Sequence, residues 1–187
     1  MRRAVMGAAG ERRGRRALAV AVIILAVDLL SKRWALLALA YGETERLLGL
    51  VPLTLAFNTG LAFGFEIQGV NRGVLLLMTT LILALLIALL RAQRPGDPYR
   101  WIGVGLVCGG ATGNLYDRLR WTGGVVDFFG PVDLGFMLWP IFNVADMSIT
   151  TGALFLAASI GWEERRGGAV AVGPEAAVTR VDAEQTP

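Results

Sequence analysis

Hydrophobic residues gather in four long runs, each close to the length that a membrane-spanning helix needs. The runs cover Ala17 to Ala40, Gly73 to Leu90, Trp101 to Leu115 and Phe142 to Trp162. A helix needs about 20 apolar residues to cross a hydrocarbon core about 30 Å thick. The pattern therefore predicts an all-α membrane protein with four transmembrane helices.

The arginines next to these runs predict which way the helices cross. The first run follows Arg12, Arg13, Arg15 and Arg16 as a signal peptide would, but it is long and lacks a clean small-residue cleavage site, so we interpret it as a retained helix. Lys and Arg concentrate on the cytoplasmic side of membrane proteins. Most arginines fall before the first run, between the second and third, or after the fourth. Both termini are therefore expected in the cytoplasm.

The two segments on the outer side hold most of the unusual polar residues. In Tyr41 to Arg72, apolar stretches at Leu53 to Phe57 and Leu61 to Phe65 flank Asn58-Thr59-Gly60, which predicts a small extracytoplasmic β-hairpin or sheet. The segment from Tyr116 to Ile141 is rich in aromatic residues, and we expect it to lie in the membrane interface with an interfacial helix.

The two ends of the chain show little periodicity. Residues 1–16 form a basic cytoplasmic N-terminus and residues 163–187 a cytoplasmic tail, and both are expected to be disordered. The four-helix membrane domain then covers residues 17–162.

Composition narrows the chemistry that is available. Hydrophobic residues make up 55% of the 187, there is no His, and Cys108 is the single cysteine. The usual ligand sets for zinc, haem and iron–sulfur clusters are missing, as are disulfides and His-based triads, so we expect no metal and no cofactor. The net charge of +3 does not indicate nucleic acid, because the arginines adjoin apolar runs. Any catalysis has to use carboxylates.

Asp28 and Lys32 are ionisable residues inside the first run. Such residues cost about 2.5 to 3.5 kcal/mol within a span, so their presence asks for a reason. They are four residues apart with the acid first, the favoured order for an ion pair on a helix. A structural pair that supports a site is the interpretation we favour over direct catalysis.

Two further polar motifs allow more than one interpretation. Asn58-Thr59-Gly60 is either a simple turn or a segment that holds a peptide substrate by its backbone. Asn114 and Arg118 lie one helical turn apart, beyond Gly105, Gly109 and Gly113, whose spacing of four favours close helix packing. They either hold a substrate carbonyl or lipid headgroup or are purely structural, whereas Asp117 is expected to be an ion-pair or capping partner.

Asp127 and Asp146 form the candidate catalytic pair. Asp127 lies between large apolar residues, and Asp146 lies about one turn into the last helix, so both are expected at the same depth below the outer interface. Two carboxylates in a poorly solvated place share a proton, so that one can accept a proton from water while the other donates to a carbonyl. For either residue alone, helix capping or a stray ion pair is the alternative.

Together these motifs resemble the bacterial lipoprotein signal peptidases, also called signal peptidase II. The resemblance covers Ala17 to Trp162. It rests on Asp28-x-x-x-Lys32, Asn58 to Phe63, Gly109 to Arg118 with Asn114 and Asp117, Val125 to Phe128 with Asp127, and Phe142 to Asp146 with Asn143.

The resemblance implies an aspartyl peptidase of the bacterial inner membrane that cuts diacylglyceryl-modified prolipoproteins just before the lipidated Cys. Asp127 and Asp146 match the two catalytic carboxylates. Asn58, Asn114, Arg118 and Asn143 match substrate-binding positions, while Asp28, Lys32, Gly60 and Asp117 match supporting ones. The resemblance also implies sensitivity to globomycin-type inhibitors and contact with membrane lipids, and we expect a monomer. Leu61 and Tyr116 depart from the family pattern, and Leu61 could change the width of the pocket.

Two other classes of function fit part of the pattern. A small transporter or channel would use Asp28, Lys32, Asp127 and Asp146 as an ion path, but it leaves the Asn-containing motifs unexplained. A membrane scaffold would use the glycine-rich third run for assembly.

Overall fold

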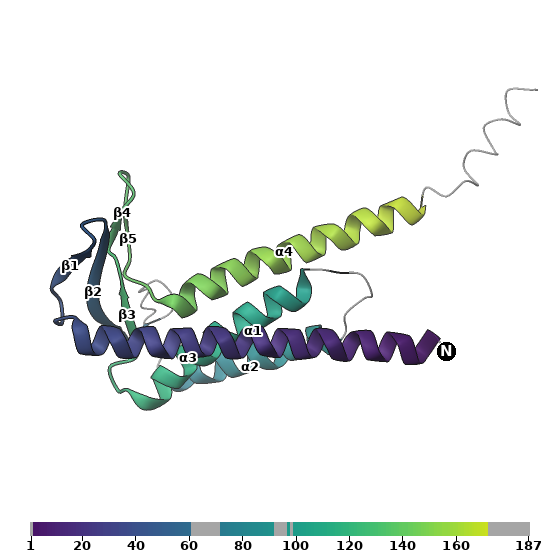
Figure 1. The fold of residues 1–187 in the computed structure, drawn as a ribbon, viewed down its shortest axis with the longest axis horizontal. Helices are drawn as coiled ribbons and strands as arrows, with labels where there is room; N and C mark the ends of the chain where they lie inside the picture. Colours follow the sequence, from purple (N-terminus) through teal and green to yellow (C-terminus); the bar gives the residue numbers. More distant parts are fainter. Residues whose placement is uncertain (1, 61–71, 92–96, 98, 172–187) are drawn as a thin grey trace, which may run out of the picture.

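The computed structural model describes residues 2–60, 72–91, 97 and 99–171, and it shows a bundle of helices with a small sheet at one end (Figure 1). The sheet lies where α1 and α3 end and where α2 and α4 begin, and the start of α1 and the end of α4 lie at the opposite end. The helices are α1 (Arg2–Ala38), α2 (Arg72–Arg91), α3 (Arg100–Arg120) and α4 (Val144–Ala171).

Helix α3 is the centre of the bundle, and it packs most extensively against α4 and α1. Glycines on its two sides allow this. A Cβ atom at Gly105 would lie 2.8 Å from the carbonyl oxygen of Ala17, and one at Gly109 would lie 2.7 Å from that of Ala21. On the side facing α4, a Cβ at Gly110 would lie 2.5 Å from the carbonyl oxygen of Ala145. The predicted close packing of the glycine stripe is confirmed.

The main sheet has three antiparallel strands in the order β1-β2-β3, with bounds β1 (Thr44–Leu47), β2 (Val51–Asn58) and β3 (Val125–Phe129). Pairing of β2 with β3 places Ala56 opposite Asp127 and Asn58 opposite Val125. Residues far apart in the sequence are thereby brought side by side. A second, two-stranded sheet pairs β4 (Val132–Asp133) with β5 (Leu138–Trp139).

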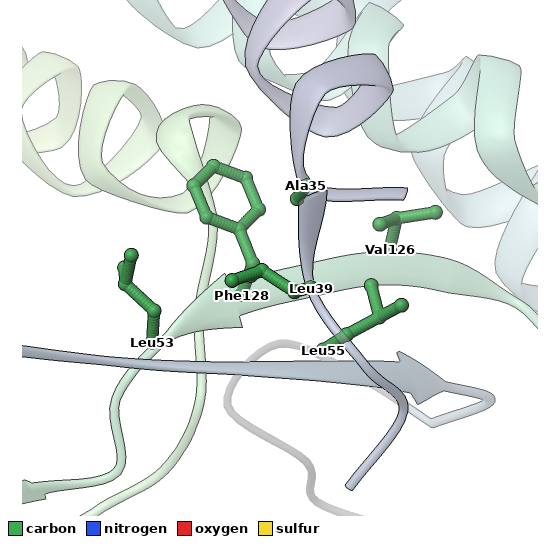
Figure 2. Packing of buried hydrophobic residues seen from close by; sticks show 6 residues of the cluster. All are labelled: Ala35, Leu39, Leu53, Leu55, Val126 and Phe128. Carbon is green, nitrogen blue, oxygen red and sulfur yellow. The ribbon is translucent and has the colours of Figure 1, made fainter. Parts of the chain in front are cut away.

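A compact apolar cluster fixes this sheet to the end of α1 (Figure 2). Successive side chains of a strand point to opposite faces. Because Val126 and Phe128 of β3 are buried in the cluster, Asp127 between them faces the other way. The hydrophobic packing therefore determines which face of β3 carries the carboxylate. The members of the cluster are Ala35 and Leu39 of α1, Leu53 and Leu55 of β2, and Val126 and Phe128 of β3.

The predicted outer hairpin is only partly correct. Leu53 to Phe57 does lie in a strand, but its partners are β1 and β3. The other stretch expected in the hairpin, Leu61 to Phe65, lies outside the described residues.

The prediction of an interfacial helix within Tyr116 to Ile141 is wrong. Helix α3 ends at Arg120, and residues 121–143 form strands, turns and bridges without a helix. Gly124 and Gly130 have φ values of 94° and 112°, which a helix does not permit. Phe128 instead packs from strand β3 against Trp34, with ring centroids 6.2 Å apart.

Both terminal segments contain helix where no regular structure was expected. Helix α1 starts at Arg2, and α4 continues to Ala171. Residues 2–16 are rich in Arg and Ala, which favour helix, and extending an existing helix is far easier than starting one. The rest of the expected disordered tail, residues 172–187, lies outside the described residues.

The outer surface of the bundle is apolar. By length and composition, one helical segment among the described residues qualifies as a membrane span, Val144–Trp162, and Gly73–Ala88 is a shorter apolar helix. Large apolar side chains on α1 and α2 nevertheless point outward, as Leu30 and Leu81 do with exposures of 70% and 60%. An exposed apolar surface of this kind is typical of proteins that meet a membrane or a partner.

The glycine contacts lead to a first prediction. Gly109→Ala should lower the free energy of unfolding by about 1–3 kcal/mol, because the added methyl group forces α1 and α3 apart. Thermal unfolding in detergent measures this effect. The matched control is Gly161→Ala on α4, where a Cβ meets nothing within 4 Å, so it should be neutral or slightly stabilising. Equal melting temperatures for the two variants would contradict the packing described here.

Candidate active site

Asp146 is held in place by the start of α4. Asn143 immediately precedes this helix, and its Oδ1 accepts a hydrogen bond of 2.9 Å from the backbone N–H of Asp146. In return, Oδ2 of Asp146 accepts one of 3.3 Å from the backbone N–H of Asn143. This reciprocal arrangement is a capping box, with Asp in the third helical position. The sequence Asn-x-x-Asp thus both starts the helix and fixes the carboxylate.

Asp127 projects from β3 toward side-chain amides from two other segments. Its Oδ1 accepts a hydrogen bond of 2.6 Å from Nδ2 of Asn143, and its Oδ2 accepts one of 3.1 Å from Nδ2 of Asn58. Oδ1 of Asn58 also accepts the backbone N–H of Gly60 at 2.9 Å. The Asn-Thr-Gly motif is therefore a turn and part of the site at once.

Asn143 joins the two carboxylates. Its side chain donates to Asp127, its backbone donates to Asp146, and both carboxylates are buried, with exposures of 2% and 6%. Burial, followed by the negative charge of Asp146, raises the pKa of Asp127 to about 7, against the lowering effect of its hydrogen bonds from Asn58 and Asn143. Around neutral pH the pair is thus able to share a proton.

A buried ammonium group lies behind the carboxylates. Nζ of Lys32 lies 2.8 Å from Oδ2 of Asp28 and 2.9 Å from Oδ2 of Asp117. It also donates a hydrogen bond of 2.9 Å to Oδ1 of Asn114. Two carboxylates and one amide oxygen therefore surround the ammonium group. The expected pair of Asp28 and Lys32 is present, and Asp117 pairs with Lys32.

Two of these acceptors connect Lys32 to the helix that carries Asp146. Oδ1 of Asp28 accepts the backbone N–H of Ala145, in the first turn of α4, at 2.9 Å. Nδ2 of Asn114 donates to Oδ1 of Asp146 at 2.9 Å. The position of the Asp146 carboxylate therefore depends on α1 and α3 as well as on α4.

The third acceptor connects Lys32 to the strand that carries Asp127. Oδ2 of Asp117 accepts the backbone N–H of Val126 at 3.2 Å. Asp117 thus holds β3 next to Asp127 as well as pairing with the ammonium group.

Arg118 brings a positive charge to the same region. It is 9% exposed, and it interacts electrostatically with Asp127 and Asp146. One terminal nitrogen donates to the carbonyl oxygen of Gly60 at 3.1 Å, while within the described part of the chain its Nε is buried without a hydrogen-bond partner. A buried donor of this kind is available to a bound molecule.

Each carboxylate borders a cavity. The cavity beside Asp127 has a volume of about 240 Å³ and is also lined by Asn58 and Thr59 of the turn. The cavity beside Asp146 has a volume of about 230 Å³ and extends along α4 to Thr151. The segment Trp139 to Phe142 contributes side chains to both cavities.

Comparison with known proteins shows the family. The family model described as signal peptidase (SPase) II matches residues 20–161. This chain belongs to the signal peptidase II family.

Among characterised relatives, the chain is 36% identical over 150 residues to the lipoprotein signal peptidase of Psychromonas ingrahamii, covering 78% of this chain and 84% of that protein. It is 37% identical over 141 residues to the lipoprotein signal peptidase of Pseudomonas aeruginosa strain UCBPP-PA14, covering 74% and 83%. Two solved bacterial membrane enzymes, determined at 2.3 Å and 1.9 Å resolution by the in meso method, have TM-scores of 0.69 and 0.66. Each is 25% identical in sequence, and they cover 80% and 78% of this chain and align over 89% and 92% of their own lengths.

The structure brings together the residues that the sequence selected for this signal peptidase II chain. Asp127, Asp146, Asn58, Asn143 and Arg118 gather at the sheet end of the bundle, with the Lys32 cluster behind them. The side-chain amide of Asn114 bonds to Lys32, Asn143 and Asp146.

Sequence reasoning missed a second polar cluster, at the far end of α3. Asp97 is 1% exposed and accepts hydrogen bonds from the backbone N–H of Tyr99 at 2.8 Å and from Oγ of Ser159 at 2.5 Å. Burial alone would raise the pKa of Asp97, but these bonds and the charge of Arg100 hold it below its usual value. This cluster ties the start of α3 to α4, and the Asp-Pro that precedes an apolar run was the available signal.

Removing the buried ammonium group should weaken the whole site. Lys32→Gln leaves Asp28 and Asp117 without their cation, so the free energy of unfolding should fall by about 3–5 kcal/mol. Thermal unfolding in detergent measures the loss. Arg33→Gln, at the exposed neighbouring position, is the matched control and should stay within about 0.5 kcal/mol of the parent. If the two variants unfold alike, the ammonium group does not hold the site together.

Asp127 should make stability depend on pH. Its pKa is raised from 3.8 to about 7, so between these values the folded protein holds a proton that the unfolded chain has lost. Its contribution to stability is fully present at low pH and falls as the pH rises through about 7. Asp127→Asn removes this titration. The melting temperature of the variant minus that of the parent should therefore increase between about pH 5 and pH 8. A difference that stays constant with pH would contradict the raised pKa.

Proposed function

We propose that this protein is a membrane aspartic endopeptidase that removes the signal peptide from diacylglyceryl-modified prolipoproteins, cutting just before the lipidated Cys. Membership of the signal peptidase II family supports the substrate class. The observation that carries the mechanism is the pair of buried carboxylates, Asp127 and Asp146, both hydrogen-bonded to Asn143.

The pair of carboxylates supports hydrolysis by activated water. With one proton on the pair, the ionised carboxylate takes a proton from water, whose oxygen attacks the carbonyl carbon of the scissile bond. The protonated carboxyl group gives its proton to the carbonyl oxygen. When the tetrahedral intermediate collapses, the C–N bond breaks and the amine leaves with a proton. The products are a free carboxylate and a new N-terminus at the lipidated Cys. The titration belongs to the coupled pair, so neither Asp is assigned one fixed role.

The surrounding residues divide into two groups in this proposal. Asn143 and Asn114 position the carboxylates, because their amides are already bonded to them. Asn58 and Arg118 bind substrate, since Asn58 lines the cavity beside Asp127 and Arg118 has a buried Nε without a hydrogen-bond partner in the described residues. A peptide carbonyl is the natural acceptor for this nitrogen.

We further propose that four helices cross the bacterial inner membrane, with both termini in the cytoplasm and the site near the outer face. The apolar outward faces of α1 and α2 support this, as does the position of the site at one end of the bundle. A substrate that is both a helix and a lipid then arrives sideways from the bilayer. Its acyl chains add about 0.8 kcal/mol of affinity per buried methylene, which accounts for a requirement for prior lipidation.

The partners that we propose follow from the family resemblance. Membrane lipids surround the bundle, the enzyme acts as a monomer without a cofactor or metal, and globomycin-type cyclic peptides inhibit it by competing for the substrate cavities. The ion-path interpretation is disfavoured, because Lys32 lies between Asp28, Asp117 and Asn114 behind the carboxylates, and Asp28 also accepts the backbone N–H of Ala145.

Cleavage of a purified diacylglyceryl prolipoprotein, followed by gel shift, tests the proposal. Asp127→Asn and Asp146→Asn should each lower the cleavage rate by at least about a thousandfold. Each variant lacks one of the two carboxyl groups that accept and donate the proton. Asp133→Asn, at an exposed Asp of β4, is the matched control and should cleave like the parent. Circular dichroism confirms that each variant is folded. An inert parent, or full activity in either folded active-site variant, would refute the peptidase mechanism.

A further inference from the structure

A pocket of about 270 Å³ lies where α1 and α3 approach the sheet, and it shares no lining residue with the cavities beside Asp127 and Asp146. Residues that line the pocket come from one face of α1 and one face of α3. Leu29 and Arg33 are four residues apart on α1, and Tyr116 and Arg120 are four apart on α3. Residues at this spacing lie on one face of a helix, so both helices turn a guanidinium group toward the same pocket.

The pocket carries an excess of positive charge. Among the described residues, its lining includes Lys32, Arg33 and Arg120 but only one carboxylate, Asp117, which is paired with Lys32. Arg33 and Arg120 are both exposed. A group that enters this pocket therefore meets two guanidinium groups whose charges no carboxylate of the lining neutralises.

The guanidinium group of Arg120 is held in position before anything binds. It donates a hydrogen bond of 2.8 Å to Oη of Tyr116 and lies 5.1 Å from the centre of the Trp121 ring. An oriented guanidinium group loses less freedom when it binds, and its planar donors match the oxygens of a phosphate.

The surroundings of the pocket favour a lipid over a soluble anion. Leu29, Leu36 and Trp121 form part of its wall. On the same ends of α1 and α3, Leu37 and Leu119 are exposed by 70% and 60%. Arginine with Trp and Tyr beside apolar surface is the composition found at the level of lipid headgroups.

We propose that this pocket binds the phosphate of a phospholipid headgroup through Arg33 and Arg120, while the acyl chains lie along the apolar ends of α1 and α3. This inference rests on the proposed placement of the sheet end at the outer surface of the membrane. Lys32 and Asp117 form the inner wall of the pocket, so a bound lipid touches the back of the cluster that supports the catalytic pair. Binding therefore stabilises the folded protein.

Thermal unfolding of the purified full chain in detergent, titrated with dioleoyl phosphatidylglycerol, tests the proposal. The melting temperature of the parent should rise with added lipid to a plateau. For the double variant Arg33→Gln/Arg120→Gln, the half-saturating concentration should be higher by about tenfold or more, since each charge-assisted bond to phosphate is lost. The control Arg12→Gln/Arg46→Gln removes the same charge from exposed positions elsewhere and should titrate like the parent.

Two further ligands show which part of the phospholipid raises the melting temperature. Dioleoylglycerol, which has acyl chains but no phosphate, and inorganic phosphate, which has no chains, should each leave the melting temperature unchanged. Equal titrations for the double variant and the control would overturn the proposal, and so would a full shift with dioleoylglycerol. A full shift with inorganic phosphate would also overturn it, in favour of a soluble-anion site.

Cleavage of the prolipoprotein is measured on the same samples, so that failure of the two proposals is distinguishable. Arg33 and Arg120 lie outside the catalytic site, so the double variant in detergent should cleave as the parent does. A parent that binds lipid but does not cleave would refute the peptidase function and leave the lipid site standing.

Discussion

The structure depends on one buried cation. Taking an ammonium group out of water costs several kcal/mol unless good partners surround it, and Lys32 has three at 2.8 to 2.9 Å. Each partner also bonds to something else: Asp28 to the first turn of α4, Asn114 to Asp146, and Asp117 to β3. The requirement to satisfy one charge thus fixes the relative positions of α1, α3, α4 and β3, and with them the two carboxylates.

The close packing of the helices and the polar cluster are parts of a single arrangement. At Gly113 an added Cβ would lie 3.0 Å from Cγ of Asp28, so a larger residue would displace the carboxylate that pairs with Lys32. Gly105 and Gly109 hold the same two helices together further along. Without a hydrophobic driving force between helices in lipid, such close contacts and buried polar bonds are what association relies on. The glycine stripe therefore sets the geometry of the charges as well as the spacing of the helices.

The sequence predicted the four helices, because long apolar runs are a strong local signal, and it selected polar residues that the structure brings together at the sheet end of the bundle. Apolar runs predict helices by their length, and an ionisable residue in such a run indicates a buried site. The strand partners of Leu53 to Phe57 were not predictable, since pairing with β3 depends on contacts between residues about 70 positions apart. The segment around Phe128 was assigned to an interfacial helix because aromatic residues are common at membrane interfaces. This preference does not distinguish a helix from a strand. Gly124 and Gly130, which exclude helix there, were the overlooked signal.

The roles of the Asn143 and Asn114 side-chain amides depend on contacts between segments that are distant in the sequence. Asn143 has the sequence signature of a helix cap, but its contact with Asp127 crosses from one segment to another. Asn114 was expected either to hold substrate or to be purely structural, and its amide bonds to Lys32 and to Asp146. Spacing along a helix shows which way a side chain points, and it does not show what the neighbouring element has already placed there.

Phe129 and Phe142 exchange backbone hydrogen bonds of 2.8 and 2.9 Å, which close residues 130–141 into a loop with both ends fixed. Asp127 stands just before this closure and Asp146 just after it. The backbone that carries the two carboxylates is thereby fixed outside the loop, so a change within the loop alters the rim of the two cavities rather than the positions of Asp127 and Asp146.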